Sequence, residues 1–156
     1  MSSEPPTRRE YTESPIILTT VRVVAPFVLT YGLFITFHGA DTPGGGFQGG
    51  VVIGTVVFLL AFAFGIDPTR EWVGHRVMAV LAGGGVIIFT GIGLATIALG
   101  GNFLEYRQFP VLDAVSATKY GMEAIEIGGI AAIISGVVMA LFFLTASGFR
   151  EEDEQA

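Results

Sequence analysis

The chain has 156 residues, of which 51% are hydrophobic and only 14% are charged, and its mean hydropathy is +0.67. This composition is typical of a membrane protein and not of a soluble domain. The net charge of −6, without a dense basic patch, argues against a nucleic-acid partner. The absence of cysteine excludes disulfides, thiolate metal sites and a cysteine nucleophile.

Four apolar runs, each close to the roughly 20 residues that cross a bilayer as a helix, alternate with short polar stretches. We therefore predict an all-α membrane protein, a bundle of four transmembrane helices. The domain is expected to cover residues 14–147, between a polar tail at 1–13 and an acidic tail at 148–156. Its spans are expected at about residues 16–37, 47–66, 77–99 and 122–146.

The stretch HGADTPGGGFQGG, residues 38–50, joins the first two expected spans. Pro43 disfavours helix at the residue before it, and the glycines that follow it can adopt positive φ without a Cβ clash. A tight reversal is therefore expected here. Gly46, Gly50 and Gly54 recur every four positions and predict a flat helix face that a second helix can approach closely.

Two further connectors are expected. Asp67 and Pro68 should end the second span, and Trp72 lies among arginines in the connector that follows, as an interfacial anchor does. Residues 100–121 form the longest connector, for which we expect a place along the membrane surface or against a partner.

Orientation is predicted from the basic residues, which favour the cytoplasmic side of a membrane. Two of them, Arg107 and Lys119, belong to the side of the glycine loop. Six belong to the side of the termini, namely Arg8, Arg9, Arg22, Arg70, Arg76 and Arg150. We therefore expect both termini in the cytoplasm of a multi-pass cell-membrane protein.

Two carboxylates, Glu123 and Glu126, stand three residues apart at the start of the fourth span, and so share one helix face. They are the candidate ion-pathway residues, because an intramembrane acid is a functional candidate by default. Glu126, the deeper one, either faces a polar pathway or pairs with a base from another helix. Alternatively, both acids lie at the water boundary near a helix N-terminus, where the dipole favours negative charge, and we favour this position for Glu123.

The motifs in the sequence do not indicate an enzyme. His38 and Asp41 are too few for a metal site, and we interpret them as helix-end and turn residues, with a cation vestibule as the alternative. The segment PGGGFQGG lacks the lysine of a phosphate-binding loop, and no nucleophile and base pair is evident. We expect no catalytic residue, no cofactor and no metal.

The segment from Ser14 to Gly54 and the segment TKYGMEAIEIGG, residues 118–129, resemble the B subunit (MnhB/MrpB domain) of Mrp-type multisubunit sodium/proton antiporters. The same domain occurs in the membrane arm of related archaeal hydrogenases. The resemblance extends over about residues 14–146. The signature-loop residues that carry it are His38, Pro43, Gly44, Gly45, Gly46, Phe47, Gly49 and Gly50.

The resemblance implies a small four-span subunit in the lipid bilayer, beside larger antiporter subunits. It implies exchange of cytoplasmic Na⁺ for external H⁺, for pH and sodium homeostasis, with Glu126 as a possible pathway acid. Two other interpretations stay open. One is a membrane-arm subunit of a redox-driven ion pump such as a hydrogenase, and the other is a self-associating scaffold or small channel that uses its glycine face.

Overall fold

The computed structural model describes residues 14–39, 43–110 and 113–155. Within these ranges the chain is helical and has no strand, which confirms the predicted all-α class. The elements are α1 (Pro15–Phe37), α2 (Gly46–Phe64), α3 (Ile66–Ala98), the 3₁₀-helix η1 (Tyr106–Gln108), α4 (Ala114–Ala124), the π-helix η2 (Ile125–Ala131) and α5 (Ala132–Gln155). Four segments are long and apolar enough to cross a membrane: Pro15–Phe37, Gly46–Phe64, Ile66–Ala98 and Val115–Ser147.

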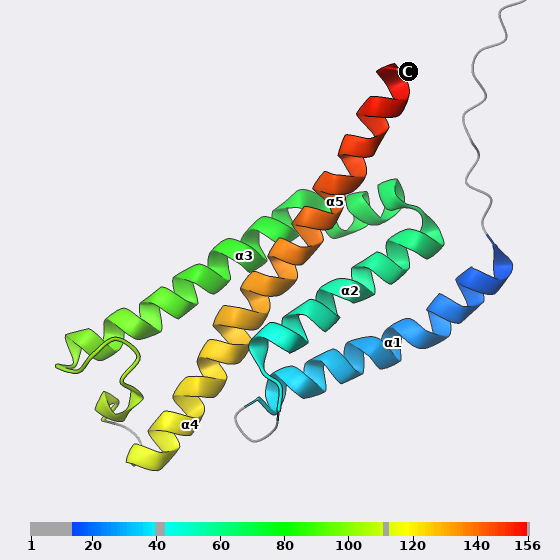
Figure 1. The fold of residues 1–156 in the computed structure, drawn as a ribbon. Helices are drawn as coiled ribbons and strands as arrows, with labels where there is room; N and C mark the ends of the chain where they lie inside the picture. The colour runs from blue at the N-terminus through cyan, green and yellow to red at the C-terminus, as the bar shows by residue number, and fades with distance from the viewer. Residues whose placement is uncertain (1–13, 40–42, 111–112, 156) are drawn as a thin grey trace, which may run out of the picture.

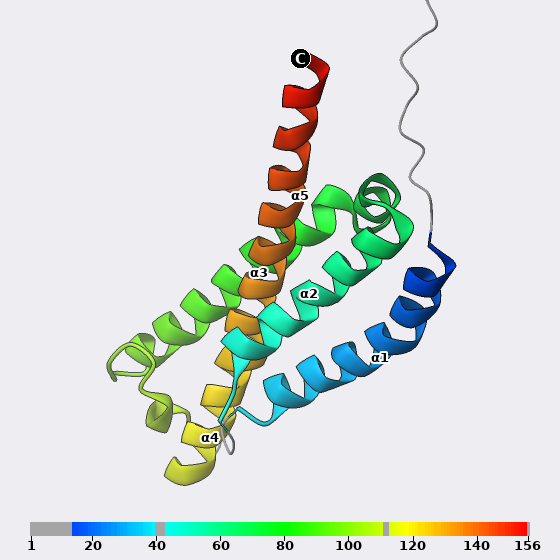
Figure 2. The ribbon, with the colours of Figure 1, turned by 45° about the vertical axis from the view of Figure 1, so that its right-hand side comes forward.

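The spans run up and down, so that each end of the bundle gathers its own set of connections (Figure 1). The start of α1, the turn from α2 to α3 and the C-terminal end of α5 lie toward one end. The loop from α1 to α2, η1 and α4 lie at the other end, as Figure 2 also shows. We call this second end the glycine-loop end.

The turn between α2 and α3 is tighter than predicted, and the segment that was expected as a connector from Asp67 is helical. α2 ends at Phe64, Gly65 makes the turn, and α3 starts at Ile66. Asp67 and Pro68 belong to the first helical turn, where proline loses no hydrogen bond and an acid interacts favourably with the helix dipole. Gly74 then interrupts the helix, because its φ of 69° and ψ of 141° are not helical, and a residue without Cβ adopts this φ readily. The residues before Gly74 thus form a short helix of their own, and the long helix that follows ends at Ala98.

The fourth span also starts earlier than expected. α4 begins at Ala114, because the side chain of Asp113 caps it by accepting a hydrogen bond of 3.3 Å from the backbone N–H of Ser116. The helix then runs without interruption through α4, η2 and α5 (Figure 1). The connector expected at 100–121 is correspondingly shorter, and the π-helical segment was not predicted.

Glycines of α2 bring three helices together. A Cβ atom at Gly50 would lie 2.8 Å from the carbonyl oxygen of Ala131, and one at Gly54 would lie 3.0 Å from Cγ1 of Val138. A Cβ at Gly49 would lie 3.0 Å from the carbonyl oxygen of Gly32 in α1. Close packing through small residues is a common mode of helix association in membranes, and here it fixes α2 between α1 and the η2–α5 helix.

Polar and apolar contacts complete the packing. The buried hydroxyl of Ser135 in α5 donates to the carbonyl oxygen of Gly50 at 3.1 Å and to that of Ala131 at 2.7 Å. α3 meets η2 and α5 through Gly85, where a Cβ would lie 2.7 Å from the carbonyl oxygen of Gly129. Among the described residues, one apolar cluster centres on Val21, Ala25, Val56 and Ala63, and another on Val73, Met78, Met139 and Phe143.

Candidate functional site

Glu126, near the start of η2, lies against the loop that joins α1 to α2. A Cβ atom at Gly39 would overlap Oε2 of Glu126 and would lie 2.9 Å from Cδ of the same side chain. A Cβ at Gly45 would lie 3.2 Å from Oε1. The Glu126 carboxyl group therefore occupies the space that side chains at these two positions would need. We call Gly39, Gly45 and Gly46 the glycine cradle.

The third member of the cradle, Gly46, contacts backbone instead of side chain. A Cβ there would lie 2.9 Å from both the carbonyl carbon and Cα of Glu126. The preceding Gly45 has φ of 149° and ψ of −164°, a conformation that residues with Cβ rarely adopt. Both the backbone conformation and the available space therefore require glycine where α2 begins.

The carboxyl group of Glu126 is enclosed but incompletely paired. Its Oε2 atom is buried and has no hydrogen-bond partner among residues 14–39, 43–110 and 113–155. Burying such an oxygen unpaired is costly. The cost is relieved when the group carries a proton, meets a cation, or receives a donor from a neighbouring molecule.

Glu126 is the second residue of the π-helix η2, which therefore positions its carboxyl group. η2 has seven residues, IEIGGIA, and π-helical turns inside α-helices are frequent at functional sites. The segment contains Gly128 and Gly129, and a Cβ at Gly129 would lie 3.3 Å from Cβ of Phe89 in α3. The glycine pair is the one sequence signal for this departure from α geometry, because hydrophobic periodicity does not report a single wide turn.

The other predicted site residues lie around the cradle. Glu123 is half-buried in α4, three residues before Glu126. The exposed ring of His38 stacks on Phe34 with centroids 4.3 Å apart, and its Nδ1 lies 3.0 Å from the Phe34 carbonyl oxygen. His38 thus packs on its own helix, while Pro43 and Phe47 are exposed.

The remaining signature residues divide between turn and packing. Gly44 has an extended backbone conformation before the cradle, with φ of 158°. Gly49 faces α1, and Gly50 faces η2 and α5. Asp41 lies outside the described residues. Among the residues that the structure describes, no group of three or more His, Asp or Glu side chains could hold a metal ion.

Two further positions near the Glu126 segment were not selected as site residues from the sequence. Gly39 is part of the glycine loop that carries the family resemblance, but its contact with Glu126 could not be predicted, because the acid lies far along the chain. Tyr106 of η1 is half-buried and lies on α4, where a Cβ at Gly121 would be 2.5 Å from its Cγ. Burial raises the pKa of the Tyr106 hydroxyl, and the negative charge of Glu126 raises it further, so the phenol stays protonated.

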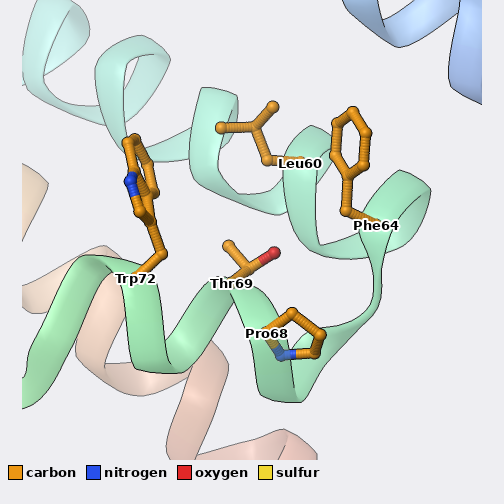
Figure 3. Close-up of a pocket in the computed structure, with 5 residues that line it drawn as sticks. All are labelled: Leu60, Phe64, Pro68, Thr69 and Trp72. Carbon is orange, nitrogen blue, oxygen red and sulfur yellow. The ribbon is translucent and has the colours of Figure 1, made fainter.

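Two hollows elsewhere in the molecule are apolar. One, of about 290 Å³, is lined by Leu60, Phe64, Pro68, Thr69 and Trp72 where α2 turns into α3 (Figure 3). The other, of about 410 Å³, shares Leu60 and Trp72 and extends between α2 and α3 toward Met139. The hydroxyl of Thr69 already donates to the carbonyl oxygen of Gly65 at 2.8 Å. Neither lining offers an ionisable group, so the Glu126 site is the better candidate for ion chemistry.

Four long apolar helices with an acid against a glycine cradle define a multi-pass integral membrane protein. The chain belongs to the MnhB family, because residues 16–147 match the family described as the domain related to the MnhB subunit of the Na⁺/H⁺ antiporter. This confirms the resemblance derived from the glycine loop and the segment around Glu126. The family match also supports the interpretation of the chain as a subunit of a Na⁺/H⁺ antiporter, which is a component of a transporter complex.

Two relatives that match more than four fifths of this chain carry antiporter names. A putative antiporter subunit mnhB2 of Staphylococcus haemolyticus is 27% identical over 144 residues, which is 87% of this chain and 97% of that protein. A Na⁺/H⁺ antiporter subunit of Bacillus subtilis is 25% identical over 137 residues, 83% of this chain and 91% of that protein. An uncharacterized protein of Methanocaldococcus jannaschii is 32% identical over 109 residues, 67% of this chain but only 40% of that protein.

Proposed function

We propose that the chain is a lipid-embedded subunit of a multisubunit antiporter that exchanges cytoplasmic Na⁺ for external H⁺, and that Glu126 is a protonatable group on its ion path. The observation that carries this proposal is the enclosed Oε2 atom, which lies on the cradle without a partner in the described part of the chain. Intramembrane acids placed in this way are frequent members of proton paths.

The remaining subunits must supply the rest of the path. The spans expose many large apolar side chains, and the described ionisable groups inside them are few. One carboxyl group can take up and release a proton, but it cannot by itself move a proton across a bilayer about 30 Å thick. We therefore infer that Glu126 connects with polar groups of neighbouring antiporter subunits.

We infer that the end with the termini faces the cytoplasm. Arg70 and Arg76 belong to the first part of α3, which starts at that end, whereas Arg107 belongs to η1 and Lys119 to α4, at the glycine-loop end (Figure 1). This distribution follows the bias of basic residues toward the cytoplasm, to which Arg8, Arg9 and Arg150 add from the sequence. The Glu126 site then lies near the external surface, where protons enter the exchange.

The test is a Glu126→Gln variant in the complete complex, with Glu123→Gln as the matched control one turn away. Everted vesicles energised by respiration are treated with Na⁺, and proton movement is followed with a pH-sensitive dye. We expect the Glu126 variant to lose most of the Na⁺-dependent signal and the Glu123 variant to keep most of it. Wild-type activity of an assembled Glu126→Gln complex would refute the proposal.

A further inference from the structure

The two apolar hollows join into one groove along α2. They share Leu60 and Trp72, and the larger hollow continues from there along α2 to Ile53. The other long helices each contribute to its lining, through Leu29, Val73, Val77 and Met139. We call the two hollows together the α2 groove.

The length of the α2 groove corresponds to one leaflet of a bilayer. Its lining along α2 extends from Ile53, near the middle of this helix, to Phe64, its last residue. With the helical rise of 1.5 Å per residue this stretch is about 16 Å long, and the apolar core of a bilayer is about 30 Å thick. An acyl chain of one leaflet fits this length, whereas a transmembrane helix of a neighbouring protein would continue through both leaflets.

The outer end of the groove has the character of a membrane interface. Figure 3 shows Trp72 and Phe64 on opposite sides of the first hollow, with Leu60 and Thr69 between them. Trp72 is 75% exposed and belongs to the short helix that precedes Gly74. Indole rings of membrane proteins are enriched at the level of the lipid headgroups. The groove therefore opens near the headgroups and extends from there into the apolar core.

A positive charge lies beside this opening. Cζ of Arg22 in α1 lies over the ring of Phe64, 5.5 Å from its centroid, and Phe64 lines the first hollow. Arg22 is exposed, and no carboxylate in the described part of the chain forms an ion pair with it. An arginine inside a span is costly unless its guanidinium reaches an anion or the headgroup layer. An anionic group above Phe64 would meet this requirement.

The other charges near the opening lie outside the groove. Asp67, Arg70 and Glu71 of the short helix are exposed, and none of them lines either hollow. The residues of this helix that line the first hollow are Pro68, Thr69 and Trp72. The charge closest to the lining is therefore that of Arg22, and it is positive.

We propose that the α2 groove binds one acyl chain of an anionic phospholipid, whose headgroup phosphate meets Arg22. An unfilled groove lacks van der Waals partners for its lining, and an acyl chain supplies them. The guanidinium donates hydrogen bonds to phosphate oxygens. A zwitterionic headgroup is disfavoured, because it brings an ammonium group close to Arg22. Basic groups beside clefts between membrane helices are typical of sites for anionic lipid headgroups.

The test is photolabelling of the complex that purifies with a tagged copy of the chain. The complex is reconstituted with phosphatidylglycerol or with phosphatidylcholine, each carrying a diazirine on one acyl chain, and labelled residues are located by mass spectrometry. We expect phosphatidylglycerol to label groove residues such as Leu60 and Val57 several-fold more than phosphatidylcholine does. Exposed residues outside the groove, among them Phe27 and Ile87, are the reference and should be labelled equally by both lipids.

Substitutions of Arg22 test the role of its charge. Arg22→Gln should lower labelling of the groove by phosphatidylglycerol to the level of phosphatidylcholine, and Arg22→Lys should keep most of the preference. Arg107→Gln is the matched control, because it removes an exposed arginine at the glycine-loop end and should behave as wild type. A preference for phosphatidylglycerol that persists in Arg22→Gln, or equal labelling of the wild-type groove by both lipids, would overturn the proposed headgroup site.

A block of the groove provides a measurement that does not depend on Arg22. Leu60→Phe places a larger side chain where the two hollows meet, and Leu94→Phe in α3 is the control at a position that is 56% exposed. Leu60→Phe should lower labelling of the groove by both lipids several-fold, and Leu94→Phe should not. A wild-type groove that neither lipid labels, beside labelled Phe27 and Ile87, would show that a neighbouring protein covers it and would refute the lipid site. These measurements record binding and not transport, so their outcome is separate from the role proposed for Glu126.

Discussion

Substitution of Gly46 by alanine should destabilise the contact between α2 and η2. The added Cβ would lie 2.9 Å from the carbonyl carbon and Cα of Glu126 and would overlap its carbonyl oxygen. Backbone atoms cannot rotate away as a side chain can, so α2 and η2 must separate by a few tenths of an ångström or more. Overpacking of this kind costs about 1–3 kcal/mol.

Alanine also favours the helical conformation more than glycine does, and this gain in stability must be subtracted from the cost of overpacking. In a helix interior, alanine is favoured over glycine by about 1 kcal/mol, and less at the first helical position, where Gly46 stands. The net loss expected for Gly46→Ala is therefore about 1–2 kcal/mol. In a chain of this length, 1 kcal/mol corresponds to a shift in Tm of roughly 2–4 °C.

Gly84→Ala in α3 is the matched control, because a Cβ at Gly84 meets nothing within 4 Å. Thermal loss of the folded, assembled protein is measured for both variants by size-exclusion chromatography after heating. Gly46→Ala should lower the midpoint by several degrees and also impair antiport, whereas Gly84→Ala should leave the midpoint equal or slightly higher. If the two variants have the same midpoint, the packing argument for the cradle is wrong.

Two further predictions concern the ends of the bundle. Hydrogen bonds from Ser116 lower the pKa of the Asp113 carboxyl, so its stabilisation of α4 is present at neutral pH and is lost as the pH falls through that lowered value. Asp113→Ala should therefore speed hydrogen exchange at residues 114–119 at neutral pH, and the difference from wild type should vanish in acid; a difference independent of pH would contradict the cap. To test the orientation, a membrane-impermeant maleimide is applied to two variants with a cysteine at an exposed position. We expect it to label Pro110→Cys in intact cells and Glu71→Cys only after permeabilisation, because Pro110 follows η1 and Glu71 belongs to the first part of α3, and these elements lie at opposite ends (Figure 1). The reverse labelling pattern would show that the chain has the opposite orientation in the membrane.

The number of spans could be predicted from the sequence because each apolar run is close to the length that crosses a bilayer. The residues at which the spans begin and end were harder to predict. Pro68 looks like a helix stop, but proline is equally compatible with a first helical turn, and only the conformation of Gly65 decides between the two. Asp113 followed by Ser116 is a helix-capping signal. The residues from Ser116 to Glu123 include several polar ones, however, so a helix that begins before the apolar run was not expected there.

The site was predictable only in its parts. Glu126 was selected because an acid inside a span is rare, and the glycines because they permit a turn. Their contact could not be predicted, because nothing in local sequence tells which face of the fourth span meets the first loop. The position of Tyr106 could not be predicted for the same reason, since it lies in a connector and only the fold brings it against Gly121 of α4.

The glycine cradle and the acid are best understood as one feature. A turn between two helices needs one or two residues with unusual backbone conformation, whereas Gly39, Gly45 and Gly46 all leave space that Glu126 occupies. Gly39 and Gly45, the loop residues described beside this carboxyl group, thereby enclose it with backbone atoms. The glycines therefore shape the surroundings of Glu126 as well as the turn, because a side chain at Gly39 or Gly45 would take the space of its carboxyl group.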